Sequence, residues 1–440
     1  MVKRKERSCG LGPQGILPIW FIPGLHIVLT VILSGLLFTP QVRAAVFTVG
    51  SVEDLPDLDP GNGVCVAYII FIPPFYVLPF CTLRAAIQET NALDGSDVIQ
   101  LQSGEYLLNK AGAGEDLGAT GDLDITGPLS ILGSKVGQTV INGNGLDRVF
   151  DIHTDASTVL LANLSITGGR SVTGNGDVTG GGGVRNRGSL SLSAVSVLGN
   201  SAKAFGPDQG GGIYNQGKCI MDQSTVSGNA ARLGGGFYND AGGTLTLRAS
   251  TIDHNRGNDG GGLYSRGTTD LINVTVSTNR AISGFGGGVR NQGNMRLLQV
   301  TVTDNVAAGG GAGIDNNGGV SLFNTIVAKN SGGECSGQAL LSSGGNLVGE
   351  AGCLNINRLV SDLVGVNPQL GTLADNGGPT RTHAIYYASP AVNQGIDRSS
   401  LGIVTDQRGM GRPMGGQYDI GAFEASVPVP PFITPLLLSQ

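Results

Sequence analysis

Gly-Gly-Gly-Val-Arg-Asn at 181–186 is the first copy of a phrase that recurs about every 25 residues. The later copies read Gly-Gly-Gly-Ile-Tyr-Asn (210–215), Gly-Gly-Gly-Phe-Tyr-Asn (234–239), Gly-Gly-Gly-Leu-Tyr-Ser (260–265), Gly-Gly-Gly-Val-Arg-Asn (286–291) and Gly-Gly-Ala-Gly-Ile-Asp-Asn (310–316). A fixed period of this length is typical of proteins in which one structural unit is stacked on the next. The repeat therefore determines how every other residue is interpreted.

Each repeat consists of short strands separated by tight corners. The stretch from Asn273 to Ser277 alternates polar and β-branched residues, which is the period of a half-buried strand. Aligned repeats share a gapless apolar column, formed by Val197, Val226, Ile252, Val276, Val302 and Val327. One coil cannot bury its own apolar face, but stacked coils can. We therefore predict an all-β, right-handed parallel β-helix over residues 97–360, with clean coils at 181–330; the hand is the usual one for crossovers between parallel strands.

The repeated asparagines are interpreted as structural ladders rather than as ligand-binding residues. Asparagine tolerates the left-handed conformation of a corner, and its amide can bond the same residue one coil away. One ladder follows the glycine phrase and the other closes each repeat; they contain Asn186, Asn215, Asn239, Asn291 and Asn316, and Asn200, Asn229, Asn255, Asn279, Asn305 and Asn330.

Residues 1–44 are predicted to be a secretory signal. Basic residues at positions 3–7 precede an apolar run at 16–38, and Val42-Arg-Ala44 offers a small-residue cleavage site. The run is long for a cleaved signal, so an uncleaved N-terminal anchor is the alternative. Removing the segment changes the net charge from −6 to −10, because five basic residues and one acidic residue leave with it. An acidic secreted chain argues against nucleic acid as a partner.

Both ends of the solenoid are expected to be capped. Residues 45–96 are predicted to be an N-terminal cap containing a short amphipathic helix at 82–90, which would cover the open sheet edges. Residues 361–426 lose the glycine phrase, are rich in turn residues and are predicted to be a C-terminal cap. The apolar tail at 427–440 is too short to span a bilayer.

Five cysteines follow the signal, in a compartment where disulfides persist. Cys65 and Cys81 bracket an apolar insertion, and Cys335 and Cys353 bracket the loop after the last clean coil, so we predict these two pairs. Cys219 falls in an inward-facing column and is predicted to be a buried, unreactive thiol.

Both ends of the chain resemble β-helix proteins of bacterial surfaces. Cys-Thr-Leu-Arg-Ala-Ala-Ile at 81–87, followed by Asn91-Ala92, resembles the CSLREA motif, with Thr82 for Ser and Ala85 for Glu. The stretches at 362–368, 373–380, 389–391, 406–409 and 419–424 are similar to the choice-of-anchor Q domain, and the glycine phrases are similar to repeats of polymorphic outer-membrane proteins. The resemblance covers most of residues 47–424 and implies a right-handed β-helix that is secreted and displayed at the cell surface. It implies no catalytic residue.

Two classes of function fit this architecture. The first is an adhesin-like or structural surface protein that binds an extracellular glycan or a matrix or surface protein, touching a membrane only through its signal segment or another anchor. The second is a polysaccharide lyase or hydrolase, which rests on fold analogy and needs clustered carboxylates. In the clean coils no carboxylate has a second one beside it, and His254 and Arg256 are interpreted as an exposed corner.

The best acidic group lies before the clean coils, in and after the loop at 112–121. It consists of Glu115, Asp116, Asp122 and Asp124. These carboxylates would form the calcium site if the chain binds that ion, which takes six to eight oxygen ligands. No other cofactor is expected.

One column stands out as a candidate contact surface. The residue before the last position of each glycine phrase follows an inward hydrophobe and should point outward; this column contains Arg185, Tyr214, Tyr238, Tyr264, Arg290 and Asp315. Three stacked tyrosines flanked by arginines would form a strip that stacks on sugar rings or partner side chains. The alternative is that the rings stack on one another and shield the sheet.

Overall fold

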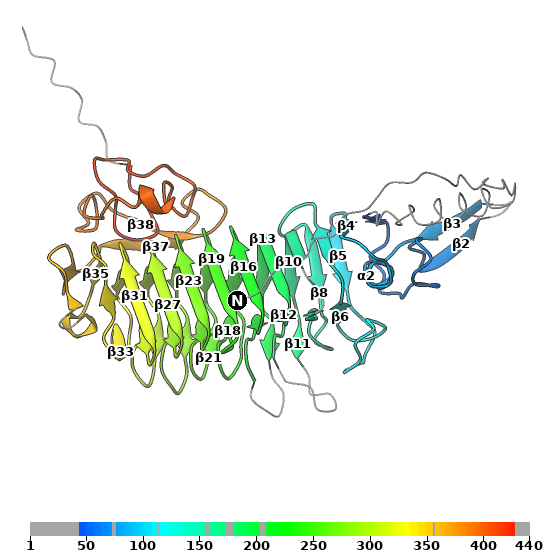
Figure 1. Ribbon diagram of the computed structural model, residues 1–440, viewed down its shortest axis with the longest axis horizontal. Coiled ribbons are helices and arrows are strands. Elements are labelled where there is room, and N and C mark those ends of the chain that lie inside the picture. Colours follow the sequence, from blue (N-terminus) through cyan, green and yellow to red (C-terminus); the bar gives the residue numbers. More distant parts are fainter. Residues whose placement is uncertain are drawn as a thin grey trace, which may run out of the picture. The chain divides into compact units, whose positions relative to one another are not determined.

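The computed structural model describes residues 44–72, 76–112, 114–154, 156, 158–171, 180–202, 208–354 and 357–426. They form a right-handed parallel β-helix in which each coil crosses three faces (Figure 1). The predicted fold class is therefore confirmed. The predicted signal segment up to Arg43 and the tail at 427–440 lie outside the described residues.

Two of the three faces join through the long strands β10 and β13. The first face consists of β1 (Val46–Val49), β4 (Asp97–Leu101), β7 (Leu129–Leu132), the first halves of β10 (Val159–Thr167) and β13 (Ser189–Leu198), β16 (Lys218–Asp222), β19 (Thr244–Arg248), β23 (Thr268–Ile272), β27 (Asn294–Leu298), β31 (Gly319–Phe323) and β34 (Leu341–Ser342). The second consists of β5 (Gly104–Leu107), β8 (Thr139–Asn142), the second halves of β10 and β13, β17 (Thr225–Ser227), β20 (Thr251–Asp253), β24 (Thr275–Ser277), β28 (Thr301–Thr303), β32 (Ile326–Ala328), β35 (Leu347–Val348) and β36 (Leu363–Val364). Because β1 pairs with β4 in parallel, the sheet begins before the boundary predicted at residue 97.

The third face carries the glycine phrases. Its strands are β6 (Leu123–Ile125), β9 (Phe150–Ile152), β12 (Val184–Asn186), β15 (Ile213–Asn215), β18 (Phe237–Asn239), β22 (Leu263–Ser265), β26 (Val289–Asn291), β30 (Ile314–Asn316) and β33 (Cys335–Gly337). Short strands line the corner between the second and third faces: β11 (Arg170–Ser171), β14 (Ser201–Ala202), β21 (Arg256–Gly257), β25 (Arg280–Ala281) and β29 (Val306–Ala307).

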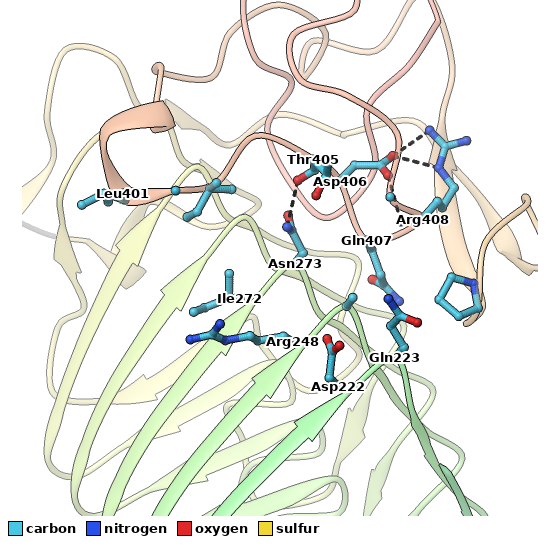
Figure 2. Close-up of a pocket in the computed structure, with 15 residues that line it drawn as sticks. Asp222, Gln223, Arg248, Ile272, Asn273, Leu401, Thr405, Asp406, Gln407 and Arg408 are labelled. Carbon is cyan, nitrogen blue, oxygen red and sulfur yellow. Dashed lines mark hydrogen bonds and ion pairs between the residues drawn. The ribbon is translucent and has the colours of Figure 1, made fainter. Parts of the chain in front are cut away.

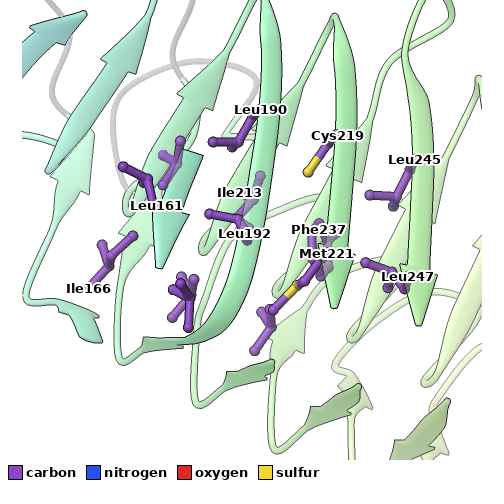
Figure 3. Close-up of a cluster of buried hydrophobic side chains, with 14 of the residues drawn as sticks. Leu161, Ile166, Leu190, Leu192, Ile213, Cys219, Met221, Phe237, Leu245 and Leu247 are labelled. Atoms are coloured by element: carbon purple, nitrogen blue, oxygen red, sulfur yellow. The ribbon is translucent and has the colours of Figure 1, made fainter. Parts of the chain in front are cut away.

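The interior is a stack of aliphatic layers (Figure 3). The thiol of Cys219 lies in register between Leu190 and Leu245, as the column alignment predicts. It is free and fully buried, and burial raises its pKa to about 12. A thiol that is neutral at physiological pH and shut off from solvent packs as a small hydrophobe.

The second asparagine ladder is continuous and buried. Asn255 accepts hydrogen bonds from both the backbone N–H and the side-chain amide of Asn229, each at 3.0 Å. Its own amide donates to Val226 O at 2.9 Å and to Asn279 Oδ1 at 3.0 Å. The same pattern continues from Asn279 to Asn305 and from Asn305 to Asn330, so these amides bond one another from coil to coil.

The N-terminal segment is organised by α2 (Leu83–Ala92), close to the predicted helix. Thr82 caps it by accepting a hydrogen bond from the N–H of Ala85 at 3.2 Å. The predicted Cys65–Cys81 disulfide is present and closes the base of the antiparallel hairpin of β2 (Tyr68–Ile72) and β3 (Tyr76–Phe80). Among the described residues no helix is long and apolar enough to cross a bilayer.

The C-terminal segment packs along the second face. Its elements are β37 (Leu370–Ala374), β38 (Thr382–Ile385) and η3 (Ser399–Leu401); η1 (Ala351–Cys353) precedes them and ends at Cys353, which forms the predicted disulfide with Cys335. Thr275 Oγ1 donates to Gln407 Oε1 at 2.7 Å, and Asn273 Nδ2 donates to Thr405 O at 2.9 Å. The segment predicted as a cap thus contacts several coils from the side, because its polar groups bond the corner residues of that face.

Candidate functional site

The outward residues of the third face form one column in register. From the first strand to the last they are Asp124, Asp151, Arg185, Tyr214, Tyr238, Tyr264, Arg290, Asp315 and Ser336. Three aromatic rings thus occupy the middle, and an arginine followed by an aspartate lies on either side. All the residues predicted to form the binding strip belong to this column.

The predicted exposure of the tyrosines is wrong. The ring centroids of Tyr214 and Tyr238 lie 5.5 Å apart and those of Tyr238 and Tyr264 lie 5.3 Å apart, but the three residues are only 2%, 1% and 7% exposed. The corners that precede the strands cover them: a Cβ at Gly180 would lie 2.9 Å from Cγ of Tyr214, and Leu233 packs against the tyrosine cluster. Glycine lets the chain pass directly over the Tyr214 ring, and the stacked rings shield the sheet.

The arginines of the column neutralise buried or half-buried carboxylates. Arg185 is 3% exposed and pairs with Asp151 through two nitrogens. Arg290 pairs with Asp259, lies 3.3 Å from Asp315 and stacks with its guanidinium carbon 5.6 Å from the centre of the Tyr264 ring. Neither arginine presents a free charge to solvent, so the strip predicted from the sequence is an internal element of the fold.

A titratable cluster lies at the N-terminal end of the column. Asp116, Asp124, Asp151 and His153 each place one ligand atom within 4.8 Å of the others. Nε2 of His153 lies 3.0 Å from Asp124, 3.6 Å from Asp151 and 3.8 Å from Asp116. Asp116 is the exposed member, whereas the carboxylates of Asp124 and Asp151 are buried.

The pKa values of the two buried carboxyls of this cluster are shifted in opposite directions. Burial raises the pKa of Asp124, although the hydrogen bond with His153 opposes the shift. Burial would also raise the pKa of Asp151, but the ion pair with Arg185 outweighs it and holds that pKa below its usual value. Neighbouring carboxyls with separated pKa values can act as an acid and a base.

The same four side chains could also hold a divalent cation. One imidazole and three carboxylates suit manganese or zinc better than calcium, which prefers oxygen ligands only. Arg187 Nη2 lies 2.9 Å from Asp151, so a cation would have to compete with two arginines for that carboxylate.

Two members of the predicted calcium group lie outside this cluster. Glu115 accepts hydrogen bonds from the N–H groups of Leu117 and Thr120, at 3.0 and 2.7 Å. Asp122 pairs with Nε of Arg148 at 2.8 Å, and burial raises its pKa well above the usual value. Glu115 is thus held by its own turn and Asp122 by a buried arginine, so only Asp116 and Asp124 of the four predicted carboxylates belong to the cluster.

Two residues of helix α2 hold this region in place. Buried Arg84 pairs with Asp54 at 2.6 Å and donates to the carbonyls of Gly118, Gly121 and Asp122. Asn91 donates to the carbonyl of Asp124 at 2.7 Å. The helix therefore fixes both the loop over the cluster and the strand that carries Asp124.

Asp151 and His153 are absent from the acidic group predicted from the sequence, although a signal for them exists. Phe150-Asp-Ile152 pairs in register with Val184-Arg-Asn186. Extending the repeat back by one coil places Asp151 in the column of Arg185, and the next coil places Asp124 beside it. The irregular loop lengths before residue 180 hide this alignment.

A polar pocket of about 290 Å³ lies where the C-terminal segment meets the coils (Figure 2). Asp222 and Arg248 contribute from β16 and β19, and Asp406 and Arg408 contribute from the C-terminal segment. Arg408 pairs with Asp406 at 2.7 Å, so this charge is already balanced.

A larger groove of about 500 Å³ lies on the corner between the second and third faces. Its apolar lining comes from Ala202, Ala230, Ala231 and Ile282, and its polar lining comes from Asp208, Arg232, Arg256 and Asn258. Arg280 follows Arg256 in register on the next coil. Arg232, Arg256 and Arg280 are exposed, and within the described part of the chain none of them forms an ion pair.

Comparison with known proteins finds no match to this chain among family models, curated proteins or solved structures. The chemistry of its own residues is therefore the basis for inferring its function.

Proposed function

We propose that this chain is a secreted protein displayed at the cell surface, and that it binds an extracellular glycan or surface protein along the flank of its coils. The observation that carries the proposal is a set of exposed arginines beside the corner groove, Arg232, Arg256 and Arg280, none of which pairs with an acidic group in the described part of the chain. Charged groups left without an internal partner on an otherwise acidic chain are available to a ligand. The tyrosine strip has no part in this proposal, because its rings are covered.

Two further features support the setting. Two disulfides fit an oxidising compartment outside the cytosol. The CSLREA-like and choice-of-anchor Q-like stretches support membership of a family of secreted β-helix proteins. Within that family Arg84 would serve architecture, since its contacts hold the first coils together.

Binding is tested with the secreted chain on an array of extracellular glycans and matrix proteins. We expect at least one class of ligand to be retained, and a variant with Arg232, Arg256 and Arg280 all changed to Gln to lose most of that retention. An array without any bound ligand would contradict the proposal. If the variant retains the ligand as well as wild type does, the ligand binds to a surface other than this corner.

The second candidate function is cleavage of a polysaccharide at Asp124 and Asp151. The specific observation is a pair of close carboxyls with opposite pKa shifts, in which Asp124, with the raised pKa, would act as the acid and Asp151, with the lowered pKa, as the base or nucleophile. The loop at 112–121 would have to open, because Gly118 N–H bonds Asp124 at 2.9 Å. Release of reducing or unsaturated sugars that disappears in Asp124→Asn would place this function first.

A further inference from the structure

We infer that the corner groove binds a linear acidic polysaccharide, whose anionic groups pair with Arg256 and Arg280 on adjacent coils. The inference rests on the proposed function, since it names the ligand class for the same surface. Arg256 of β21 and Arg280 of β25 are in-register partners in a parallel sheet. Adjacent coils lie about 4.8 Å apart, so the two side chains leave the corner side by side.

Like charges directly opposite each other in a sheet are unfavourable unless something neutralises them. The first face shows that this solenoid can supply such a partner. Arg296 lies in register with Asp270 on the neighbouring coil and binds it through two nitrogens, at 2.7 and 2.6 Å. Among the residues that the structure describes, Arg256 and Arg280 have no such aspartate in register, and both side chains are exposed.

The chemistry of the groove fits a sugar polymer with carboxylate or sulfate groups. The planar guanidinium of arginine binds such anions through two parallel hydrogen bonds. Beside Arg256, Ala230, Ala231 and Ile282 form a small apolar surface that can pack against the C–H face of a sugar ring, and the Asn258 amide can bond a hydroxyl. Asp208 is the one acidic residue among the described lining residues and would disfavour very close approach of an anion at its end.

The charge of the whole chain favours a polysaccharide over a nucleic acid. The net charge is −6, so a duplex with a phosphate on every nucleotide would be repelled over most of the surface. A single polysaccharide chain with at most about one charge per sugar has a lower charge per length than a two-stranded duplex and can place its anions on the arginine side of one corner. Arg256 and Arg280 follow one another from coil to coil, so an extended polymer that runs along the solenoid axis could contact both.

The test compares four immobilised probes with the secreted chain: polygalacturonate, the same polymer with its carboxyls reduced, chondroitin sulfate and duplex DNA. We expect binding to polygalacturonate or chondroitin sulfate, with the stronger of the two identifying the anion, and little binding to the reduced polymer or DNA. Charged hydrogen bonds of this kind are each worth about tenfold or more in affinity, so the variant with Arg256→Gln and Arg280→Gln should bind at least about tenfold more weakly. Added salt should weaken wild-type binding.

The matched control is Arg358→Gln, which removes an exposed arginine far along the chain from the groove and should bind like wild type. Equal binding to the reduced polymer, preference for DNA, or unchanged affinity in the double variant would each overturn the inference. If these probes fail while the array retains a neutral glycan or a matrix protein, the ligand class is wrong but the binding function stands. If the array also retains nothing, the proposed function fails as well.

Discussion

Polar groups inside the regular coils and in the first coils are stabilised in different ways. Between residues 200 and 330 the buried asparagine that closes each repeat bonds to the asparagine one coil away, as Asn255 does with Asn229 and Asn279. In the first coils many of the buried polar groups are charged, and they pair with unlike residues, as Arg84 does with Asp54. An amide both donates and accepts, so it can pair with a copy of itself, whereas a carboxylate only accepts. A repeated asparagine can therefore satisfy its hydrogen bonds with copies of itself, whereas a buried aspartate needs a different residue as its partner.

The comparison predicts that the largest loss of stability comes from a unique charged partner. Arg84→Met removes the cation that neutralises Asp54 and the donors to three carbonyls of the covering loop. Breaking a buried pair in this way should lower the free energy of unfolding by about 3 to 5 kcal/mol. Urea unfolding measures the loss, and faster proteolysis within 112–121 would locate it.

Arg358→Met, at an exposed position, should leave both readouts close to wild type. An Arg84→Met variant within about 0.5 kcal/mol of wild type, which is the range of ordinary surface substitutions, would show that the first coils do not depend on this arginine.

The middle of the third-face column should be nearly as sensitive, although it carries no charge. Tyr238→Ala removes a buried ring that stacks on two others, and should cost about 3 kcal/mol. Tyr238→Phe keeps the stack and should cost less than about 1 kcal/mol. Thermal unfolding of both variants separates packing from the hydroxyl. A Tyr238→Ala variant as stable as wild type would show that the ring contributes little packing and would favour an exposed strip.

A single rung of the asparagine ladder should matter somewhat less. Asn255→Ala leaves the amide groups of its neighbours without partners inside the coils, which should cost about 2 kcal/mol. Asn258→Ala, at an exposed position, is the control. Chemical denaturation compares the two. Equal stability would mean that water replaces the ladder and that the coils do not rely on it.

The smallest effect concerns pH. Burial raises the pKa of Asp147 to about 6, against the opposing charge of Arg148. A carboxyl with a raised folded-state pKa stabilises the fold below its unfolded pKa of about 3.9, and this stabilisation is lost as the pH rises through 6. Asp147→Asn should therefore be more stable than wild type at pH 8, by about 1 to 2 kcal/mol, and should lose this advantage below pH 4.

Thermal unfolding across this pH range is the measurement. A constant stability difference between Asp147→Asn and wild type from pH 4 to pH 8 would mean that the Asp147 carboxyl does not titrate in this range. Its charge would then make no pH-dependent contribution to the stability of the first coils.

The fold was predictable from the sequence wherever coils repeat. The alignment that placed Cys219 between Leu190 and Leu245 needs only the order of residues, because in-register stacking converts sequence period into spatial neighbours. The two disulfides follow from the loops that they close. Before residue 180 loops of unequal length break the period, so the pairing of Asp124 with Asp151 stays hidden.

The sequence by itself determined the coil, its inward columns and its ladders, because each is a local pattern copied along one axis. Only the tertiary structure decided which outward residues reach solvent. The tyrosines point away from the core, yet the corners of the coils cover them, and the arginines of that column turn to buried or half-buried carboxylates. Exposure depends on how the backbone of the corners lies over its neighbours, and among the described residues no acidic residue lies in register beside Arg256 or Arg280.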